Sequence, residues 1–384
     1  MLVLHNMKIA LIGLPQTGKK TVFSLMTGIG LDHLLGRPGE FHVGNVKVTD
    51  PRIDRLVALY NPKKTKYAEI EVTLAPAPPH EPKPREQWLN KLKNMDAFCH
   101  IVRAFEDPAV FHSKGSVDPL RDIDEINLEL AISDLSLIET RLSGIVQDQK
   151  KKFDQDRADE AALLEQLKPY LESGKSLREY PWHDGDEKKL RSLQFLTMKG
   201  LVVALNGSES DPKLIEAAKA KLGLEGEAPA EPSGAARREA RPPRGTEICF
   251  LSAKTEAEVA QIEDLKERTE FLMALGITEP ALHVLTQKLY KALGYISFFT
   301  TGEDEVRAWT IRQGATAVDA AHAIHSDIAR GFIRAEVMKY AELIAAGATG
   351  HAAEVKLKET GRLLVKGKDY IVEDGDTVHI RHSG

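Results

Sequence analysis

The stretch LIGLPQTGKKT, residues 11–21, carries the first prediction about the fold of this chain. Its Gly-x-x-x-x-Gly-Lys spacing is that of a loop that binds phosphate groups. Glycines let the backbone curl until several amide N–H groups point at phosphate oxygens, and the positive end of the following helix adds attraction. We therefore predict a phosphate-binding loop between a strand and a helix, formed by Gly13, Pro15, Gln16, Thr17, Gly18, Lys19, Lys20 and Thr21.

The position after Lys19 departs from this motif. A Ser or Thr hydroxyl normally ligates Mg²⁺ there, but this chain carries Lys20, whose ammonium group cannot ligate a metal. Thr21 lies about 100° farther around the helix and faces elsewhere. Two interpretations stay open: Lys20 replaces the charge of the metal, or it points to solvent and binding is weak. Mg²⁺ is therefore a doubtful cofactor.

Composition indicates an ordinary globular protein. The 384 residues predict two or three domains, and 28% charged with 42% hydrophobic residues allows an ample core. A net charge of −5 argues against a globally basic nucleic-acid-binding protein but leaves room for a local basic face. No apolar run is long enough to predict a membrane span. Cys99 and Cys249 lie in apolar runs, which predicts buried thiols in a cytoplasmic protein.

The first three quarters of the chain predict an α/β domain with a helical insertion. Apolar strand candidates at 8–13, 69–74, 97–105, 201–206 and 247–253 alternate with helical stretches, a pattern typical of a mainly parallel sheet. Apolar positions at helical spacing then predict two long antiparallel helices between about 121 and 180, with the stripes Ile126, Leu130, Leu137, Ile145 and Leu163, Leu164, Leu167, Leu171. Lys150, Lys151 and Lys152 form either a solvated tip or a contact with RNA phosphates. Residues 226–245 have the composition of a flexible insertion.

The last section predicts a small sheet packed on one helix, which is the β-grasp, ubiquitin-like plan. Strand candidates VRAWTI, FIRAEV, RLLVKG, KDYIV and TVHIRH surround a helix that Thr316 starts with a capping pattern and Gly331 ends. Asp319, His322 and His325 drift around that helix, so we expect no metal site. Two aromatic residues, Trp309 and Phe332, fit the core of the sheet, although an aromatic side chain there could also stack on RNA.

The chain resembles the YchF/Obg-like ATPase family along nearly its whole length. The matching stretches are IGLPQTGKKT, DPRIDRL and RSLQFLTMKG, together with residues 100–135, 298–338 and 367–381. The resemblance implies an α/β P-loop NTPase with a Rossmann-like, mainly parallel sheet, an inserted α-helical coiled-coil arm and a C-terminal TGS domain of β-grasp fold. We expect a P-loop domain at 1–120 and 191–278, the arm at 121–190, a linker helix at 279–297 and the TGS domain at 298–384.

The family also implies a preference for ATP, read by an Asn-x-x-Glu motif, and contact with the ribosome or RNA through the arm and the TGS domain. Asn206 and Glu209 have this spacing directly after a strand candidate, and Ser252, Ala253 and Lys254 would form the last loop beside the base. GTP stays open because Asp211 is close enough to compete with Glu209. We expect a monomer.

The chain departs from the family where the metal is held. The Asp-x-x-Gly motif expected after residues 69–74 is missing, because residues 70–79 contain neither Asp nor Gly. The glycine-rich segment that follows in the family is shortened to HEPKPREQW, and no Thr lies between Gly28 and Val48 to cap a metal. Because phosphoryl transfer depends on the metal, we expect a nucleotide-binding regulator with weak or lost hydrolysis, and we assign no catalytic residue. An ATPase that uses Glu69 or Glu71 as rearranged metal ligands, and an interaction protein with a vestigial site, are the alternatives.

Overall fold

The structure is a computed structural model that describes residues 7–183, 185–224, 245–262, 264–275 and 280–383. Within these ranges the chain forms two compact units. The phosphate-loop unit comprises residues 7–45 and 71–293, and the C-terminal unit comprises residues 46–70 and 294–383. The inclusion of residues 46–70 in the C-terminal unit has no counterpart in the sequence predictions, because it depends on contacts between distant parts of the chain.

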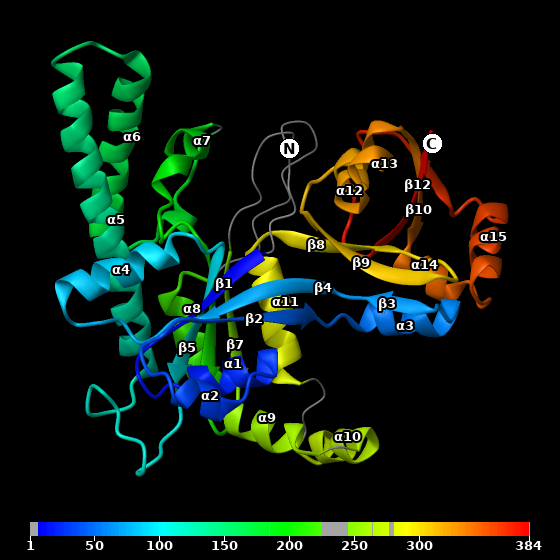
Figure 1. The fold of residues 1–384 in the computed structure, drawn as a ribbon, viewed down its shortest axis with the longest axis horizontal. Coiled ribbons are helices and arrows are strands. Elements are labelled where there is room, and N and C mark those ends of the chain that lie inside the picture. The colour runs from blue at the N-terminus through cyan, green and yellow to red at the C-terminus, as the bar shows by residue number, and fades with distance from the viewer. Residues whose placement is uncertain (1–6, 184, 225–244, 263, 276–279, 384) are drawn as a thin grey trace. The chain divides into compact units, whose positions relative to one another are not determined.

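The sheet that carries the phosphate loop is mainly parallel, as predicted. Among the described residues it has six strands in the order β2-β4-β1-β5-β6-β7 (Figure 1). The pairs β1–β5, β5–β6 and β6–β7 are parallel. Its strands are β1 Met7–Ile12, β2 His42–Val48, β4 Ala68–Leu74, β5 Ala97–Arg103, β6 Gly200–Asn206 and β7 Thr246–Leu251.

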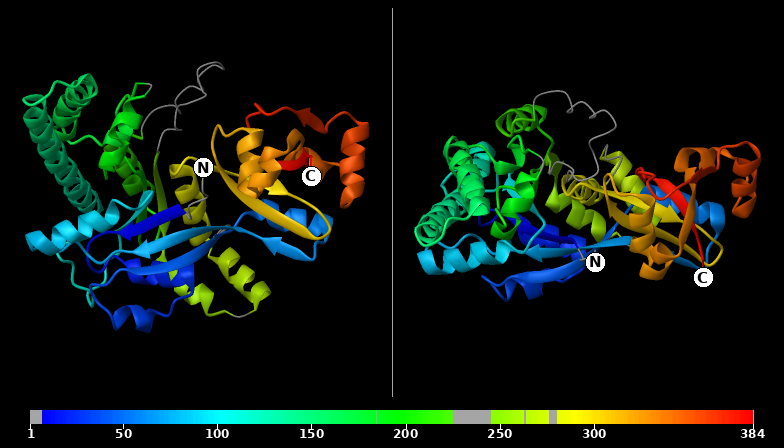
Figure 2. Two further views of the ribbon diagram at one scale, coloured as in Figure 1. Left: turned by 45° about the horizontal axis from the view of Figure 1, so that its top comes forward. Right: turned by 90° about the horizontal axis from the view of Figure 1, so that it is seen from above.

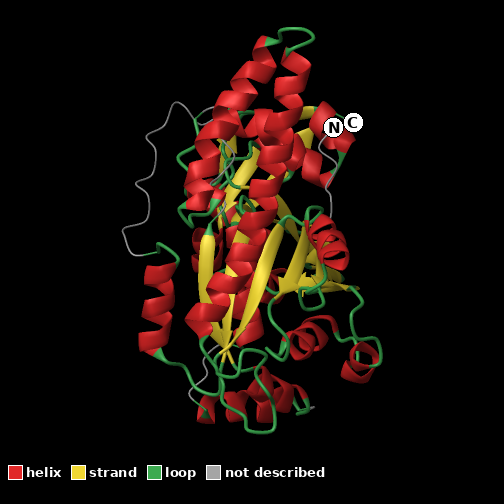
Figure 3. Ribbon diagram, turned by 90° about the vertical axis from the view of Figure 1, so that its left-hand side faces the viewer, coloured by secondary structure: helices red, strands yellow, loops and turns green. Residues whose placement is uncertain are grey.

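Helices cover this sheet on both faces, and Figure 3 shows them on either side of the strands. The central strands β5 and β6 are buried along their whole lengths, as continuous apolar runs in a parallel sheet require. Helices α4, α5 and α8 share an apolar cluster with one face, whereas α11 packs on β6 and β7 with buried residues outside that cluster. The helices besides α5–α7 are α1 Lys19–Thr27, α2 Leu31–Leu35, α4 Pro82–Leu92, α8 Pro212–Lys221, α9 Ala253–Ala260, α10 Leu265–Ala274 and α11 Ala281–Ala292.

Long helices α5 (Pro119–Gln149) and α6 (Gln155–Glu172) lie side by side, as Figures 1 and 2 show. Ile145 of α5 and the predicted α6 stripe, Leu163, Leu164, Leu167 and Leu171, are buried in a cluster between the two helices together with Ile138, whereas Leu137 is only half-buried. The other two residues of the predicted α5 stripe, Ile126 and Leu130, are buried against the sheet instead. Residues 150–152 between the helices are exposed. The short elements η1 Leu177–Glu179, α7 Asp186–Leu190 and η2 Arg191–Leu193 then lead back to β6.

The C-terminal unit has its own mixed sheet. Its strands, counted over the described residues, run in the order β11-β10-β12-β8-β9-β3, with antiparallel pairs except for β12–β8 and β3–β9. Phe332 is buried in the core under α12, and Trp309 is half-buried against it. The elements are α3 Pro51–Tyr60, β3 Lys64–Lys66, β8 Tyr295–Thr300, β9 Glu305–Arg312, α12 Ala317–Ile324, α13 Ser326–Arg330, β10 Phe332–Lys339, α14 Tyr340–Ala345, α15 His351–Glu359, β11 Leu364–Lys366 and β12 Asp376–His382.

Two local predictions for this unit were wrong. The helix expected after Thr316 breaks at His325, whose backbone is extended and whose side chain accepts from the Asp327 N–H to cap the next helix. The stretch KDYIV does not form a strand and contributes only the isolated bridge between Ile371 and Thr316. The predicted capping pattern is present, because the Thr316 and Asp319 side chains each accept from the other residue's N–H.

Other sequence predictions concern the surface and the thiols. Cys99 and Cys249 are buried and unpaired with each other, and burial raises the pKa of Cys249 to about 12. Within the described part of the chain, no helix is both long and apolar enough to cross a membrane. The predicted insertion at 226–245 lies, except for Gly245, outside the described residues.

Candidate functional site

The predicted phosphate loop lies between the end of β1 at Ile12 and the start of α1 at Lys19. Gly13 and Gly18 both have positive φ angles, 142° and 88°, which side chains other than glycine rarely adopt. A Cβ atom at Gly13 would overlap the Ile101 carbonyl, and one at Gly18 would overlap the Asn206 amide. Glycine is therefore required at both positions for the backbone to curl as it does.

Lys19 is folded back over the loop. Its Nζ donates hydrogen bonds to the carbonyl oxygens of Gly13 at 2.6 Å and Leu14 at 2.5 Å. The residue is only 7% exposed, and this burial, with a smaller effect from the Lys20 charge, lowers the pKa of Lys19 to about 7. The side chain is therefore poised between its charged and neutral forms near neutral pH.

Lys20 takes a direction that neither sequence interpretation anticipated. Its Nζ donates to the Leu34 carbonyl oxygen at 2.9 Å, at the end of α2. The nearby hydroxyl of Thr17 is buried and donates to the Leu14 carbonyl at 3.3 Å. Neither side chain offers an oxygen ligand where the motif places one for Mg²⁺, so the residues present do not fit that metal.

Asn206 connects the loop to the far edge of the sheet. It ends β6, is 4% exposed, and its Nδ2 donates to the Thr17 carbonyl at 2.9 Å while its Oδ1 accepts from the Ala253 N–H at 2.9 Å. Ser252 caps α9 by accepting from the Thr255 N–H. The structure thus brings the sequence-predicted phosphate loop into contact with Asn206 and Ala253.

Glu209 and Asp211 differ in what their carboxylates do. Asp211 caps α8, where its Oδ1 accepts from the backbone N–H groups of Lys213 at 2.9 Å and Leu214 at 3.3 Å. Glu209 is exposed in the turn that follows β6. Of these two acids, Asp211 is therefore engaged by the helix and Glu209 faces solvent near Asn206.

Sequence reasoning missed His100, which lies on β5 directly beneath the loop. Its ring would lie 3.4 Å from a Cβ at Gly13, and the residue is 1% exposed. Neither ring nitrogen has a hydrogen-bond partner among the described residues, and burial together with the Lys19 charge lowers the pKa of His100 to about 3. The available signal was one histidine inside the apolar run AFCHIV.

The segment that follows β5 is fixed by buried polar groups. Arg103 is 1% exposed and donates to the carbonyl oxygens of Phe105 at 3.1 Å and Val110 at 2.9 Å. Buried His112 contacts Asp122 on α5 through its Nε2 at 2.9 Å. These contacts hold residues 113 and 114 next to the phosphate loop.

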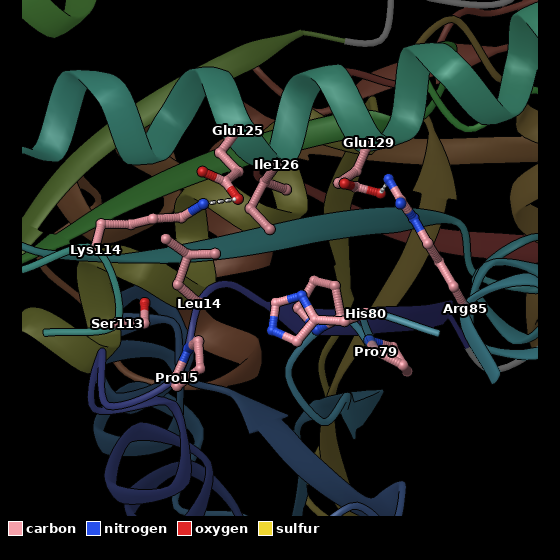
Figure 4. A pocket seen from close by; sticks show the side chains of 11 residues that line it. Leu14, Pro15, Pro79, His80, Arg85, Ser113, Lys114, Glu125, Ile126 and Glu129 are labelled. Atoms are coloured by element: carbon pink, nitrogen blue, oxygen red, sulfur yellow. Dashed lines mark ion pairs between the residues drawn. The ribbon is translucent and has the colours of Figure 1, made fainter. Parts of the chain in front are cut away.

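A cavity of about 180 Å³ opens at the Leu14–Pro15 end of the loop. Figure 4 shows it between the loop and α5. Ion pairs lie across it, from Lys114 Nζ to Glu125 Oε1 at 2.7 Å and from Arg85 to Glu129. The lining residues are Leu14, Pro15, Pro78, Pro79, His80, Arg85, Ser113, Lys114, Glu125, Ile126 and Glu129.

No metal-binding carboxylate replaces the missing motif after β4. The Ala75 N–H donates to the Leu11 carbonyl at 3.0 Å, and residues 76–79 are prolines and alanine. Glu71 pairs with Lys8 at 3.6 Å, near the beginning of β1, whereas the loop follows the end of that strand. Across the described ranges, no group of three His, Cys, Asp or Glu side chains is arranged to bind a metal ion.

A parallel sheet with a glycine loop between its strand and helix, braced by Asn206, defines the fold of a P-loop nucleoside triphosphatase. Comparison of the sequence with known proteins supports the same class. The chain is 36% identical over 382 residues to the ribosome-binding ATPase YchF of Bacillus subtilis (strain 168), covering 97% of this chain and 98% of that protein. It belongs to the YchF/Obg-like ATPase family.

Further relatives extend across bacteria and animals. Ribosome-binding ATPase YchF of Escherichia coli O157:H7 is 34% identical, with 97% of this chain and 98% of the relative covered. Obg-like ATPase 1 of Caenorhabditis elegans is 33% identical, with 98% and 92% covered. The solved YchF GTPase of Schizosaccharomyces pombe has a TM-score of 0.77 at 28% identity and 98% coverage of both chains. The family model YchF-GTPase_C, described as a protein of unknown function (DUF933), matches residues 295–383.

Proposed function

We propose that this chain binds a purine nucleotide, with ATP preferred over GTP, and acts as a ribosome-associated regulator that hydrolyses nucleotide weakly or not at all. The observation that carries the proposal is the Asn206 amide, which holds Thr17 of the loop on one side and Ala253 on the other. This bracing keeps the phosphate loop and the loop after β7 in one preformed site, which lowers the entropic cost of binding. Relatives named ribosome-binding ATPases support the nucleotide and the ribosome.

The phosphates would lie on the backbone amides between Gly13 and Thr21, with Lys19 as the cationic partner. In the free chain the Lys19 ammonium is held by loop carbonyl oxygens. A triphosphate offers ionised oxygen acceptors, which attract an ammonium group more strongly than neutral carbonyl oxygens do. Nucleotide binding would therefore draw Lys19 out of its buried contacts toward the phosphates.

The preference for ATP rests on Glu209. Asn206 and Glu209 have the Asn-x-x-Glu spacing that the family uses for ATP, and a carboxylate can accept a hydrogen bond from the exocyclic amine of adenine. Glu209 is exposed near Asn206, whereas Asp211 already caps α8. Glu209 is therefore our candidate for reading the base, and Ser252 and Ala253 are our candidates for the loop beside the base.

Weak hydrolysis follows from the residues at the metal positions. Lys20 stands in place of the loop hydroxyl and donates to the Leu34 carbonyl, and residues 70–79 contain no Asp. Divalent metals normally hold and neutralise the developing charge in phosphoryl transfer. Of the rearranged ligands considered from the sequence, Glu71 is paired with Lys8 near the opposite end of β1. We therefore expect this chain to bind nucleotide but to hydrolyse it weakly or not at all.

Calorimetric titration with ATP and GTP, each in Mg²⁺ and in EDTA, tests the proposal. We expect ATP to bind more tightly than GTP, EDTA to change the ATP affinity by less than about threefold, and phosphate release to stay near background. The Glu209→Ala variant should lose the preference for ATP, whereas the control Glu216→Ala, which changes an exposed side chain of α8, should keep it. Strict dependence on Mg²⁺ with turnover abolished in Lys19→Ala would instead identify an ATPase. Binding of neither nucleotide would leave an interaction protein.

Ribosome contact would use the α5–α6 pair as an arm and residues 298–384 as a TGS domain. Lys150, Lys151 and Lys152 are exposed where α5 passes into α6, so they can approach RNA phosphates. Replacing all three by Gln should reduce co-sedimentation with ribosomes and weaken its dependence on salt. Lys168→Gln, which removes one exposed lysine of α6, is the control. Unchanged sedimentation of the triple variant would exclude this contact.

A further inference from the structure

The two ends of the phosphate loop contact different parts of the phosphate-loop unit. Its Thr17–Gly18 end meets Asn206 and Ala253, where the proposed function places the base. Its Leu14–Pro15 end opens on the cavity of about 180 Å³. A nucleotide that lies along the loop from the base end would therefore direct its terminal phosphate toward the cavity.

We propose that this cavity receives the terminal phosphate, and that Arg85 and Lys114 bind it there in place of a metal ion. The proposal rests on the nucleotide site argued above and adds residues that the phosphate-loop motif does not contain. It assigns to these two cations a role for which the usual metal ligands and the Asp-x-x-Gly segment are missing. Binding would make the chain sensitive to the difference between ATP and ADP.

Size and charge both favour a phosphate group. The cavity is several times larger than the roughly 30 Å³ that one water molecule occupies in the liquid. Arg85 and Lys114 enter it from α4 and from the segment after β5, and His80 also lines it (Figure 4). The side chains of Arg85 and Lys114 are 33% and 40% exposed, so each can turn toward a ligand.

The carboxylates of α5 explain why these cations are already in place. Glu125 and Glu129 lie one helical turn apart on the same face and hold Lys114 and Arg85 respectively. A terminal phosphate carries more negative charge than a carboxylate, and arginine can bind it with two parallel hydrogen bonds. The arriving phosphate would take both cations, and the glutamates would turn toward water.

Rigid surroundings keep the two cations at the loop. Lys114 follows a segment pinned by buried Arg103 and by the contact between His112 and Asp122. Arg85 is one turn into α4, whose Trp88 is buried and donates to the Pro76 carbonyl at 3.0 Å. Because these supports are buried, we expect substitutions at the two exposed tips to change binding without unfolding the site.

Titration with ADP and with the non-hydrolysable imido analogue of ATP, both in EDTA, separates this role from general nucleotide binding. The double variant Arg85→Gln/Lys114→Gln should bind the ATP analogue about tenfold or more weakly, with ADP affinity within about twofold of the unmodified chain. The matched control Arg141→Gln/Lys168→Gln breaks ion pairs of the α5–α6 pair and should change neither affinity. Glu125→Gln, which releases Lys114 from its carboxylate, should strengthen binding of the ATP analogue.

The outcomes distinguish this inference from the proposed function. Equal losses for ADP and the ATP analogue, or no loss for either, would overturn the role of Arg85 and Lys114 while leaving the nucleotide site intact. Binding of the ATP analogue that requires Mg²⁺ in the unmodified chain and becomes weaker in Glu125→Gln would mean that the carboxylates hold a metal, and would also overturn it. If the unmodified chain binds neither nucleotide, both proposals fail. Thermal melting of each variant checks that a lost affinity does not come from unfolding.

Discussion

Replacing Lys19 by Met should remove a pH-dependent part of the stability of the phosphate-loop unit. Lys19 is 7% exposed and donates to the carbonyl oxygens of Gly13 and Leu14. Burial lowers its pKa from 10.5 to about 7. Between these pH values the unfolded chain binds more protons than the folded chain, so the free energy of unfolding rises with pH.

The magnitude follows from the two pKa values. With 10.5 for the unfolded chain and about 7 for the folded chain, Lys19 contributes an increase of about 2 kcal/mol in the free energy of unfolding between about pH 7 and about pH 9. The Met variant lacks this contribution. Its stability relative to the unmodified chain should therefore fall by the same amount over that interval, whatever the constant offset from the lost hydrogen bonds.

Urea unfolding at several pH values measures this difference. Trp88 and Trp182 belong to the phosphate-loop unit and Trp309 to the C-terminal unit. A Trp309→Phe background therefore makes tryptophan fluorescence report on the unit of interest. Groups other than Lys19 titrate in both proteins and cancel in the comparison.

Nucleotide binding gives the same reasoning a second measurement. Phosphate oxygens near Lys19 should raise its pKa again, so binding at about pH 8 should take up about 0.9 of a proton. Calorimetry in buffers with different ionisation enthalpies measures that number. Parallel stability profiles for the Met variant and the unmodified chain, or binding without proton uptake, would refute a buried Lys19 with a lowered pKa.

Three further substitutions test other parts of the structure. Gly18→Ala should abolish nucleotide binding and lower the free energy of unfolding by about 1–3 kcal/mol, because its φ is positive and its Cβ would displace Asn206. The control Gly28→Ala, where φ is also positive but no atom is near, should lower stability without changing nucleotide binding. Equal effects of the two variants on binding would contradict the predicted clash with Asn206. Asp134→Ala should lower the free energy of unfolding, measured in urea, by about 3 kcal/mol or more, because the buried carboxylate accepts from two backbone N–H groups and one hydroxyl. A loss below about 1 kcal/mol would show that water replaces the carboxylate. Thr316→Ala should lower the free energy of unfolding of the C-terminal unit by about 1 kcal/mol, measured through Trp309 fluorescence, because the α12 cap is lost. No change in stability would show that this cap is dispensable.

The phosphate loop and its sheet could be predicted because their signals are local. Glycine spacing in residues 13–18 determines a curl that only positive φ angles allow, and the apolar runs of β5 and β6 match strands buried on both faces. The α5–α6 stripes were equally local, since helical period alone places Leu163 and Leu167 on one side. The helix predicted after Thr316 was too long, because sequence periodicity did not reveal that His325 ends it by capping α13.

The candidate site was also predictable only where its signals are local in the sequence. Residue type and spacing in the sequence predict Gly13, Gly18, Lys19 and Asn206 as site residues, and the usual metal-ligand motifs are missing from the sequence; both inferences need only residues that are close together in the chain. Only the tertiary structure decided that Lys20 binds the Leu34 carbonyl, that His100 lies under the loop, and that Arg85 and Lys114 share a cavity with Pro15. These groups are far apart in the chain, and their proximity depends on packing between α4, α5 and the sheet, which local sequence does not encode.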